Sequence, residues 1–430
     1  MKQRFFRLAA VNILSNLMVP LAGAIDTAFL GHLADIRYLA GVALATVLFN
    51  YIYWTFGFLR MGITGMTAQA QGRGDEREVA LTLLRYGMVA LTIGLLILLL
   101  QQPLRELGFW LLQAQPDVLT AGRDYYNALI WGAPATLLNF TILGWFLGRG
   151  AGKQVLILSV VAKGANIALD YLFIVRWGWA SSGAGAATAL SQYLNLSVGL
   201  LLIWRSLKYL PTLNKQLLDR SQFAAIFQLN RDITIRTLAL VSTFALFTNF
   251  SSAISTNTLA TNTLLLQVVT FSAYFIDGIA FATESIVGNL RGQQEYTQLR
   301  QILQLAAVSS ISIGIAIACL FCLAPKILFG ILTSHESVIT QVTSYVWWLL
   351  PILATGAIAY MLDGYFLGLT QGKILRNSSL VATGIGFLPL GIIASLGQNN
   401  HLLWLALSSF MATRAITLVL KLDKQKMVKL

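Results

Sequence analysis

The chain has 430 residues, of which 57% are hydrophobic and only 11% are charged, and its mean hydropathy is +0.70. Soluble domains carry about 25% charged residues, so this composition excludes an ordinary soluble protein. The net charge of +13 comes from basic residues that are spread along the chain, so we expect no nucleic-acid partner.

Twelve apolar segments follow one another along the chain, and each is long enough to cross a bilayer as a helix, which takes about 18 residues or more. They are 8–31, 39–70, 79–101, 118–147, 154–175, 183–204, 229–256, 258–290, 298–324, 338–369, 374–396 and 401–420. The first has no small-residue cleavage site behind a short apolar core, so we expect a span and not a removed signal. The predicted fold class is an all-α polytopic membrane protein.

The basic residues lie in alternate loops between these segments. One set of loops and ends holds Lys2, Arg4, Arg7, Arg73, Arg77, Arg85, Arg149, Lys153, Arg205, Lys208, Lys215, Arg220, Arg291, Arg300, Lys373, Arg376, Lys421, Lys424, Lys426 and Lys429. The opposite set holds only Arg37, Arg105, Arg123, Arg176 and Lys326. By the positive-inside rule, both termini are predicted to be cytoplasmic.

An internal repeat divides the chain into two halves. The segment GWFLGRGAGK (144–153) matches GYFLGLTQGK (364–373) at an offset of 220 residues, and the same offset pairs Gly72 with Gly292. Six helices in each half predict two pseudo-symmetric six-helix lobes in the same orientation, with a substrate path between them. The predicted lobes are 1–204 and 229–430, joined by a cytoplasmic linker, 205–228. The repeated G-x-x-x-G in each match favours close helix packing.

Polar residues deep inside the first-half spans are the candidate site. In AGAIDTAFLGHL, Asp26 lies 19 residues beyond Arg7, roughly 28 Å from the inner surface at 1.5 Å per residue. Asp170, 17 residues beyond Lys153, lies at roughly 25 Å, and Thr188 lies roughly 9 Å below the outer surface. These side chains therefore share a level. A charge at the bilayer centre costs about 2.5–3.5 kcal/mol on insertion scales, so such residues face a partner or a cavity.

The fifth span carries Lys163, Asn166 and Asp170 on one face, because they are three and four residues apart. Together with Asp26, they can exchange a proton or bind a cation. The alternative for Asp26 is a carboxylate that caps a helix or meets water. The offset of 220 duplicates neither aspartate, since it leads to Leu246 and Leu390.

The second half has acids of its own, of which Asp277 and Asp363 are candidates for substrate binding or for a coupling site in the second lobe. Asp363 lies roughly 15 Å and Asp277 roughly 21 Å from the inner surface, whereas Glu284, at roughly 10 Å, is expected to meet cytoplasmic water. Arg60 and Lys163 are near mid-membrane in the first half. We interpret them as counter-ions to acids, with contact to an anionic substrate group as the alternative.

Several motifs together resemble the MATE (multidrug and toxic compound extrusion) transporters, specifically the DinF-like branch. They are PLAGAIDTAFLGHL, FGFLRMGITGMTAQAQG, NIALDYLFI, GAGAATALSQY and DGYFLGLTQGKILRNS. The resemblance covers essentially the whole chain and implies twelve helices in two lobes that open alternately to either side. It also implies export of organic compounds in exchange for H⁺ or Na⁺.

By motif match, the coupling residues that the resemblance implies are Asp26, Asn166, Asp170 and Thr188. Asp363 falls near an acid that other MATE branches use. One departure concerns the first helix, where this branch commonly has a proline and this chain has Val11. Pro20 is retained, so a bend of the first helix is expected to be displaced or weaker.

The sequence therefore predicts a secondary active exporter coupled to H⁺, with Na⁺ as the less favoured ion and no other cofactor or metal. The alternative is a flippase for lipid-linked precursors, which needs several cations in its cavity, and only Arg60 and Lys163 are available. An enzyme is not expected, since the chain has no histidine pair, G-x-S-x-G or H-E-x-x-H.

The expected substrate is a small organic molecule. Aromatic residues make up 11% of the chain and suit a flat, cationic compound, while the two intramembrane cations leave anionic or zwitterionic ones open. The expected partners are otherwise the lipid bilayer alone, with a monomeric protein. A bacterial inner membrane is the expected location, with an organelle membrane as the alternative.

Overall fold

The computed structural model describes residues 1–33, 35–112, 115–207, 216–333 and 335–427. Within these residues, twelve helical stretches are long and apolar enough to cross a membrane, which confirms the predicted number. The repeat is visible in their spacing: the third to sixth stretches begin at Glu76, Pro116, Gly152 and Ala180, and the ninth to twelfth begin 220 residues later at Tyr296, Glu336, Gly372 and Asn400.

The chain divides into two compact units. The first unit is Leu14–Ile226, and the second unit is Met1–Ile13 together with Phe227–Leu430. Both boundaries fall inside long helices, α1 (Lys2–Gly31) and α10 (Arg220–Ile254). Residues 1–13 thus group with the second unit, whereas the repeat assigns them to the first lobe. Of the predicted linker, residues 208–215 lie outside the described residues, and residues from 220 onward begin α10.

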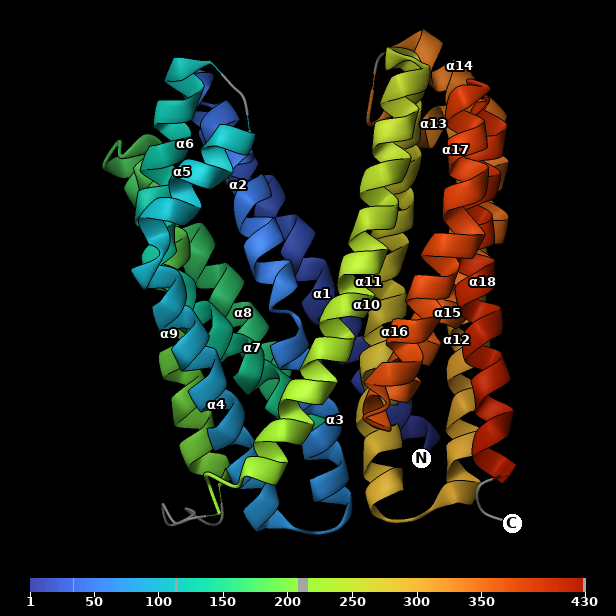
Figure 1. Ribbon diagram of the computed structural model, residues 1–430. Coiled ribbons are helices and arrows are strands. Elements are labelled where there is room, and N and C mark those ends of the chain that lie inside the picture. Colours follow the sequence, from blue (N-terminus) through green and yellow to red (C-terminus); the bar gives the residue numbers. More distant parts are fainter. Residues whose placement is uncertain (34, 113–114, 208–215, 334, 428–430) are drawn as a thin grey trace. The chain divides into compact units, whose positions relative to one another are not determined.

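The first unit is built around α7, which packs against α3, α4 and α9. Its colours in Figure 1 run from blue to green. Besides part of α1, its helices are α2 (Arg37–Thr55), α3 (Phe58–Gly72), α4 (Glu76–Leu99), α5 (Gln101–Leu111), α6 (Pro116–Leu129), η1 (Ile130–Gly132), α7 (Ala133–Gly148), α8 (Gly152–Asp170), η2 (Tyr171–Arg176) and α9 (Ala180–Ser206).

The second unit repeats this plan around α15, which packs against α11, α12 and α18. Its helices run from yellow-green to red in Figure 1. Besides most of α10, they are α11 (Thr256–Gly292), α12 (Tyr296–Leu323), α13 (Pro325–Gly330), α14 (Glu336–Tyr345), η3 (Val346–Trp348), α15 (Leu349–Gly368), α16 (Gly372–Val381), η4 (Ala382–Phe387), α17 (Leu388–Leu396) and α18 (Asn400–Met427).

The repeated glycines mark the same close helix contact in each unit. A Cβ atom added at Gly148 would lie 2.6 Å from the carbonyl oxygen of Thr64, and one added at Gly368 would lie 2.5 Å from that of Glu284. Real Cβ atoms do not come so close, so only glycine allows α3 to touch α7 and α11 to touch α15. This confirms the packing role predicted for both motifs.

Three turns also recur at the same offset, with different residues in the two units. At these three positions the first unit has glycine, whereas the second unit has a residue with a side chain. The pairs are Gly74 (φ 72°) and Gln294 (63°), Gly150 (66°) and Thr370 (57°), and Gly178 (69°) and Gln398 (47°). The helix junctions therefore impose this backbone conformation even where the residue does not favour it.

Hydropathy does not predict several local features. The short helices α5 and α13 follow the third and ninth spans, and the second span is interrupted between Thr55 and Phe58. The turns η2 and η4 are π-helical, a form that is rare and typical of functional segments. Helix α1 is continuous through Pro20.

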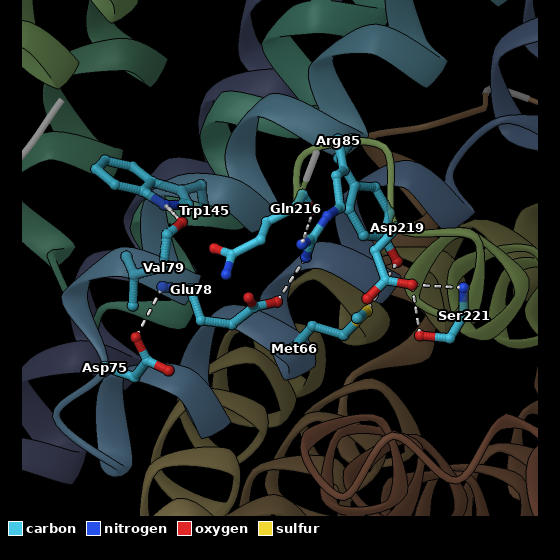
Figure 2. Close-up of polar contacts among 10 residues, drawn as sticks. Met66, Asp75, Glu78, Val79, Arg85, Trp145, Gln216, Asp219 and Ser221 are labelled. Carbon is cyan, nitrogen blue, oxygen red and sulfur yellow. Dashed lines mark hydrogen bonds and ion pairs between the residues drawn. The ribbon is translucent and has the colours of Figure 1, made fainter. Parts of the chain in front are cut away.

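Each unit encloses a completely buried tryptophan with a hydrogen-bond partner. In the first unit, the Trp145 indole N–H donates to the carbonyl oxygen of Val79 at 2.9 Å (Figure 2). In the second unit, the Trp404 indole N–H donates to Oδ1 of Asn262 at 2.8 Å. Because the indole N–H is satisfied, these large side chains can lie inside the helix bundles at little cost.

Arg85 binds the segment that precedes α10. It is counted among the basic loop residues by sequence, yet it is buried in α4, where it pairs with Glu78 at 2.7 Å and donates to the Gln216 carbonyl oxygen at 2.9 Å (Figure 2). A few residues on, the Asp219 carboxylate accepts from the hydroxyl and the backbone N–H of Ser221. These bonds hold the pKa of Asp219 below its usual value and fix the start of α10.

Candidate functional site

The first unit contains a polar cluster between α8 and α9. The side-chain amide of Asn166 donates to the Asp170 carboxylate at 2.8 Å and lies 3.4 Å from the Thr188 hydroxyl oxygen. Asn166 is 5% and Asp170 1% exposed. The amide thus fixes the orientation of a carboxylate that is buried at the end of α8.

Small residues in α9 make room for this cluster. The segment GAGAATA (183–189) has no large side chain, and a Cβ atom at Gly185 would lie 2.5 Å from the carbonyl oxygen of Tyr125 on α6. Helices α6, α8 and α9 pack together here. Their closeness lets side chains of moderate length meet in one place.

Asp26 reaches the same cluster from α1. It is half-buried, and its carboxyl group lies within hydrogen-bonding reach of Asp170. Lys163, which lies on the same face of α8 as Asp170, interacts electrostatically with the carboxyl groups of Asp26 and Asp170. The structure therefore brings together Asp26, Asn166, Asp170, Thr188 and Lys163, which we call the aspartate cluster.

Tyr125 belongs to this site as well, and the sequence did not reveal it. It is 8% exposed, and its hydroxyl interacts with the hydroxyls of Thr46 and Thr188 and with the charges of Asp26 and Asp170. An uncharged aromatic residue in an aromatic-rich chain carries no sequence signal of its own. Only the contact between α6 and α9 places it here.

The charges of the aspartate cluster do not balance. Two carboxylates face one lysine, so the cluster has one negative charge in excess when all three groups are ionised. Uncompensated charge in a membrane interior is costly. A single added cation would neutralise it, and two carboxyl groups within hydrogen-bonding reach can share one proton between them.

The second unit has a different polar cluster, which we call the arginine cluster. The Asp363 carboxylate accepts hydrogen bonds from Arg236 of α10 and, at 2.6 Å, from Arg414 of α18. Arg414 is completely buried and its guanidinium lies 5.4 Å from the Tyr360 ring centroid. Asp277 interacts electrostatically with Arg414. Two arginines thus face two aspartates, and the charges balance.

Comparison with known proteins decides the family. The MatE family model matches residues 12–172 and again residues 233–395. The chain belongs to the MATE family of transporters. It is 34% identical to DNA damage-inducible protein F of Escherichia coli over 416 residues, covering 96% of this chain and 90% of that protein.

More distant matches agree. The chain is 25% identical to a probable multidrug resistance protein NorM of Synechocystis over 340 residues, covering 73% of this chain and 70% of that protein. A crystal structure of MATE in the straight conformation superposes with a TM-score of 0.89 at 19% identity, covering 100% of this chain and 97% of that one. The family resemblance, the fold of two six-helix lobes and the absence of an enzymatic role are therefore confirmed.

Two predictions about polar residues of this MATE transporter are wrong. Arg60 and Lys163 are not the only intramembrane cations, since Arg236 and Arg414 lie in the seventh and twelfth spans. The sequence itself marks Arg236 and Arg414 as intramembrane residues, because each interrupts an apolar run. Glu284 is 0% exposed and does not meet cytoplasmic water, because it lies in the tight contact between α11 and α15.

Arg60 lies on α3 and not on the helices of the aspartate cluster. It is half-buried, and its carbonyl oxygen accepts a hydrogen bond from the Thr64 hydroxyl at 2.7 Å. A Cβ atom added at Gly144 would lie 2.5 Å from the same carbonyl oxygen. Its backbone therefore contributes to the contact of α3 with α7.

Proposed function

We propose that this MATE transporter exports small organic compounds in exchange for protons, and that the aspartate cluster carries the proton. One observation supports this assignment above others: Asp26 and Asp170 lie within hydrogen-bonding reach of one another with a single lysine as counter-charge. A shared proton removes the excess charge and joins the two carboxyl groups. Na⁺ is the less favoured coupling ion, because part of the cluster is the cation Lys163.

The arginine cluster supports the choice of the first unit. Its charges balance without an added ion, so Asp277 and Asp363 are assigned a structural role and not a coupling role. Both arginines lie against Asp363, and Arg414 is completely buried. They are thus poorly suited to receive the pyrophosphate that a flippase for lipid-linked precursors would bind.

Alternating access links the proton to export in this proposal. Coupling requires that proton and substrate favour different states of the transporter, since a ligand shifts an equilibrium only by its differential affinity. Asn166 orients Asp170, while Thr188 and Tyr125 supply neutral hydroxyls beside the pair. Protonation of the pair changes the charge on α1 and α8 together.

Substrate and location complete the proposal. The aromatic content favours cationic organic substrates, and we place both termini on the cytoplasmic side of a bacterial inner membrane, where the protein acts as a monomer. No cofactor beyond the coupling ion is expected.

Transport in proteoliposomes tests the coupling. The purified chain is reconstituted with an imposed pH gradient, and a pH-sensitive dye records whether organic cations, and then anions, collapse the gradient. We expect collapse with the wild type and none with Asp26→Asn. The matched control is Asp35→Asn, which removes a carboxylate paired with Arg37 at the exposed start of α2.

The outcomes separate the alternatives. Collapse that persists in Asp26→Asn would remove that residue from the coupling step. Transport that follows an imposed Na⁺ gradient and ignores the pH gradient would replace H⁺ by Na⁺. Movement of a labelled lipid-linked pyrophosphate, without any transport of organic ions, would favour the flippase.

A further inference from the structure

A groove of about 420 Å³ opens between α16 and α18 of the second unit. Both helices belong to the orange and red part of the chain (Figure 1). Lys373, Asn377, Ser378, Thr417 and Lys421 line it, together with apolar residues of α16. None of these residues belongs to the aspartate or the arginine cluster.

Two lysines at one end of the groove are available to a ligand. Arg376, on the same helix, donates to Asp232 at 2.7 Å and so points toward α10. Lys373 and Lys421 are exposed. Within the described part of the chain, neither pairs with a carboxylate, and no acidic side chain lines the groove. Among the described side chains, this end of the groove therefore presents two positive charges with no carboxylate beside them.

The base of the groove is fixed by a contact between its two walls. The hydroxyls of Ser378 on α16 and Thr417 on α18 lie 2.6 Å apart. Both walls are regular helix, so the two lysines project from positions that are held in place. A fixed separation of the two helix positions lowers the ordering cost of bringing both ammonium groups to one phosphate.

Above the lysines, the same helices present an apolar surface. Their exposed side chains include Leu380 (48%), Ile385 (71%), Ile416 (58%) and Leu420 (62%), all inside membrane-spanning segments. Exposed apolar side chains at these positions suit contact with acyl chains. The groove thus combines a cationic end at the membrane boundary with an apolar wall. This combination is complementary to an amphiphile with an anionic headgroup.

The repeat shows that packing alone does not require this pattern. At the offset of 220, Lys373 corresponds to Lys153 of the first unit, but Lys421 corresponds to Leu201. Asn377 and Ser378 correspond to Ile157 and Leu158. The first unit builds the same pair of helices with one lysine and apolar walls.

We propose that this groove binds an anionic phospholipid from the inner leaflet, with Lys373 and Lys421 against the headgroup phosphate and the acyl chains along the exposed apolar side chains of α16, η4 and α18. Asn377, Ser378 and Thr417 complete the lining of the groove. The site is independent of the coupling ion and of the exported substrate.

Lipid titration of the purified full chain tests the proposal. The protein in a neutral detergent is titrated with dioleoylphosphatidylglycerol or dioleoylphosphatidylcholine, and native mass spectrometry counts bound lipid while fluorescence follows Tm. We expect the anionic lipid alone to bind and to raise Tm. Lys421→Gln should weaken its binding about five-fold, and Lys373→Gln with Lys421→Gln about 25-fold, from the typical contribution of a lysine near anionic lipid.

Controls keep the proposal falsifiable. Lys153→Gln removes the corresponding lysine of the first unit and should leave phosphatidylglycerol binding unchanged. If the double variant does not fold, the single variants Lys373→Gln and Lys421→Gln must each show the five-fold loss. Equal binding of both lipids, wild-type affinity in both single variants, or equal protection by inorganic phosphate would overturn the proposal.

Discussion

The two units of this transporter share a backbone plan but differ in the charges they enclose. In the first unit, Asp26 and Asp170 share one lysine, and Asp170 accepts a hydrogen bond from the neutral amide of Asn166. In the second unit, Asp363 is held by two guanidinium groups, which stay charged at any pH a protein meets. The aspartate cluster can therefore gain a proton, whereas the charges of the arginine cluster balance without one.

This difference teaches where function resides in a repeated fold. The close helix contacts at Gly148 and Gly368 and the three left-handed turns recur at one offset, so the scaffold is common to both units. The acids do not recur at that offset. We therefore attribute the difference between the proposed coupling site and the structural one to the charged side chains that each unit adds to the common scaffold.

The largest effect is expected from neutralising the first-unit pair. Asp170→Asn should reduce proton-coupled transport to the background of empty liposomes, because the remaining Asp26 is balanced by Lys163 and no excess charge is left to bind a proton. The purified variant should keep its Tm within a few degrees. Gradient collapse at the wild-type rate would place coupling elsewhere, with Asp363 as the next residue to test.

The same change in the second unit should act on stability. Asp363→Asn removes the carboxylate that accepts hydrogen bonds from both buried arginines, and breaking a buried ion pair costs about 3–5 kcal/mol. Thermal unfolding in detergent measures this loss, with Asp35→Asn at the surface as the control that changes little. Adding Arg414→Met to Asp363→Asn should restore part of the loss. A variant as stable as the wild type would show that the arginine cluster is not structural.

Stability should be equally sensitive in both units to an added methyl group at the close helix contact. Gly144→Ala and Gly364→Ala each force a methyl group against the backbone of Arg60 or Ala280, and overpacking of this kind costs about 1–3 kcal/mol. Gly164→Ala is the matched control, since an added Cβ there meets nothing within 4 Å, and it should stabilise α8 by about 0.5–1 kcal/mol. Unequal losses at Gly144 and Gly364 would show that the two contacts are not equivalent.

The smallest effect concerns the turns, where residues can be exchanged between the units. Gly74→Gln places a side chain at a left-handed position (φ 72°) and should cost about 1–2 kcal/mol. Gln294→Gly removes such a side chain (φ 63°) and should stabilise by less than about 1 kcal/mol, because glycine is more flexible in the unfolded chain. Chemical unfolding measures the stability of both variants. Stability changes of the same sign in the two variants would contradict this prediction.

Hydropathy and residue spacing predicted most of the fold and of the first-unit cluster. Twelve spans follow from composition alone, and Asn166 and Asp170 share a helix face through their spacing of four residues. Depth along the helices placed Asp26 and Thr188 at the level of Asp170, and the resemblance implied the same residues. Spacing along one helix does not specify which residues of α1, α8 and α9 contact one another. Those contacts depend on how the three helices pack.

The remaining features depend on contacts between distant segments. Tyr125 joins the site because α6 meets α9 at Gly185, and nothing in its own neighbourhood marks it. Arg236 and Arg414 are separated by 178 positions and meet at Asp363 only in the folded unit. The helices α5 and α13 are too short for hydropathy to detect, and a π-helical turn such as η4 has no periodicity to reveal it.

The two buried tryptophans give each unit an optical signal of its own. Trp145 lies completely inside the first unit and Trp404 completely inside the second, and indole emission moves to longer wavelength when water reaches the ring. A variant that retains only Trp145, and another that retains only Trp404, would therefore report the melting of the units separately. Coincident midpoints would mean that the units melt as one cooperative body, and separate midpoints that each is a folding unit in its own right.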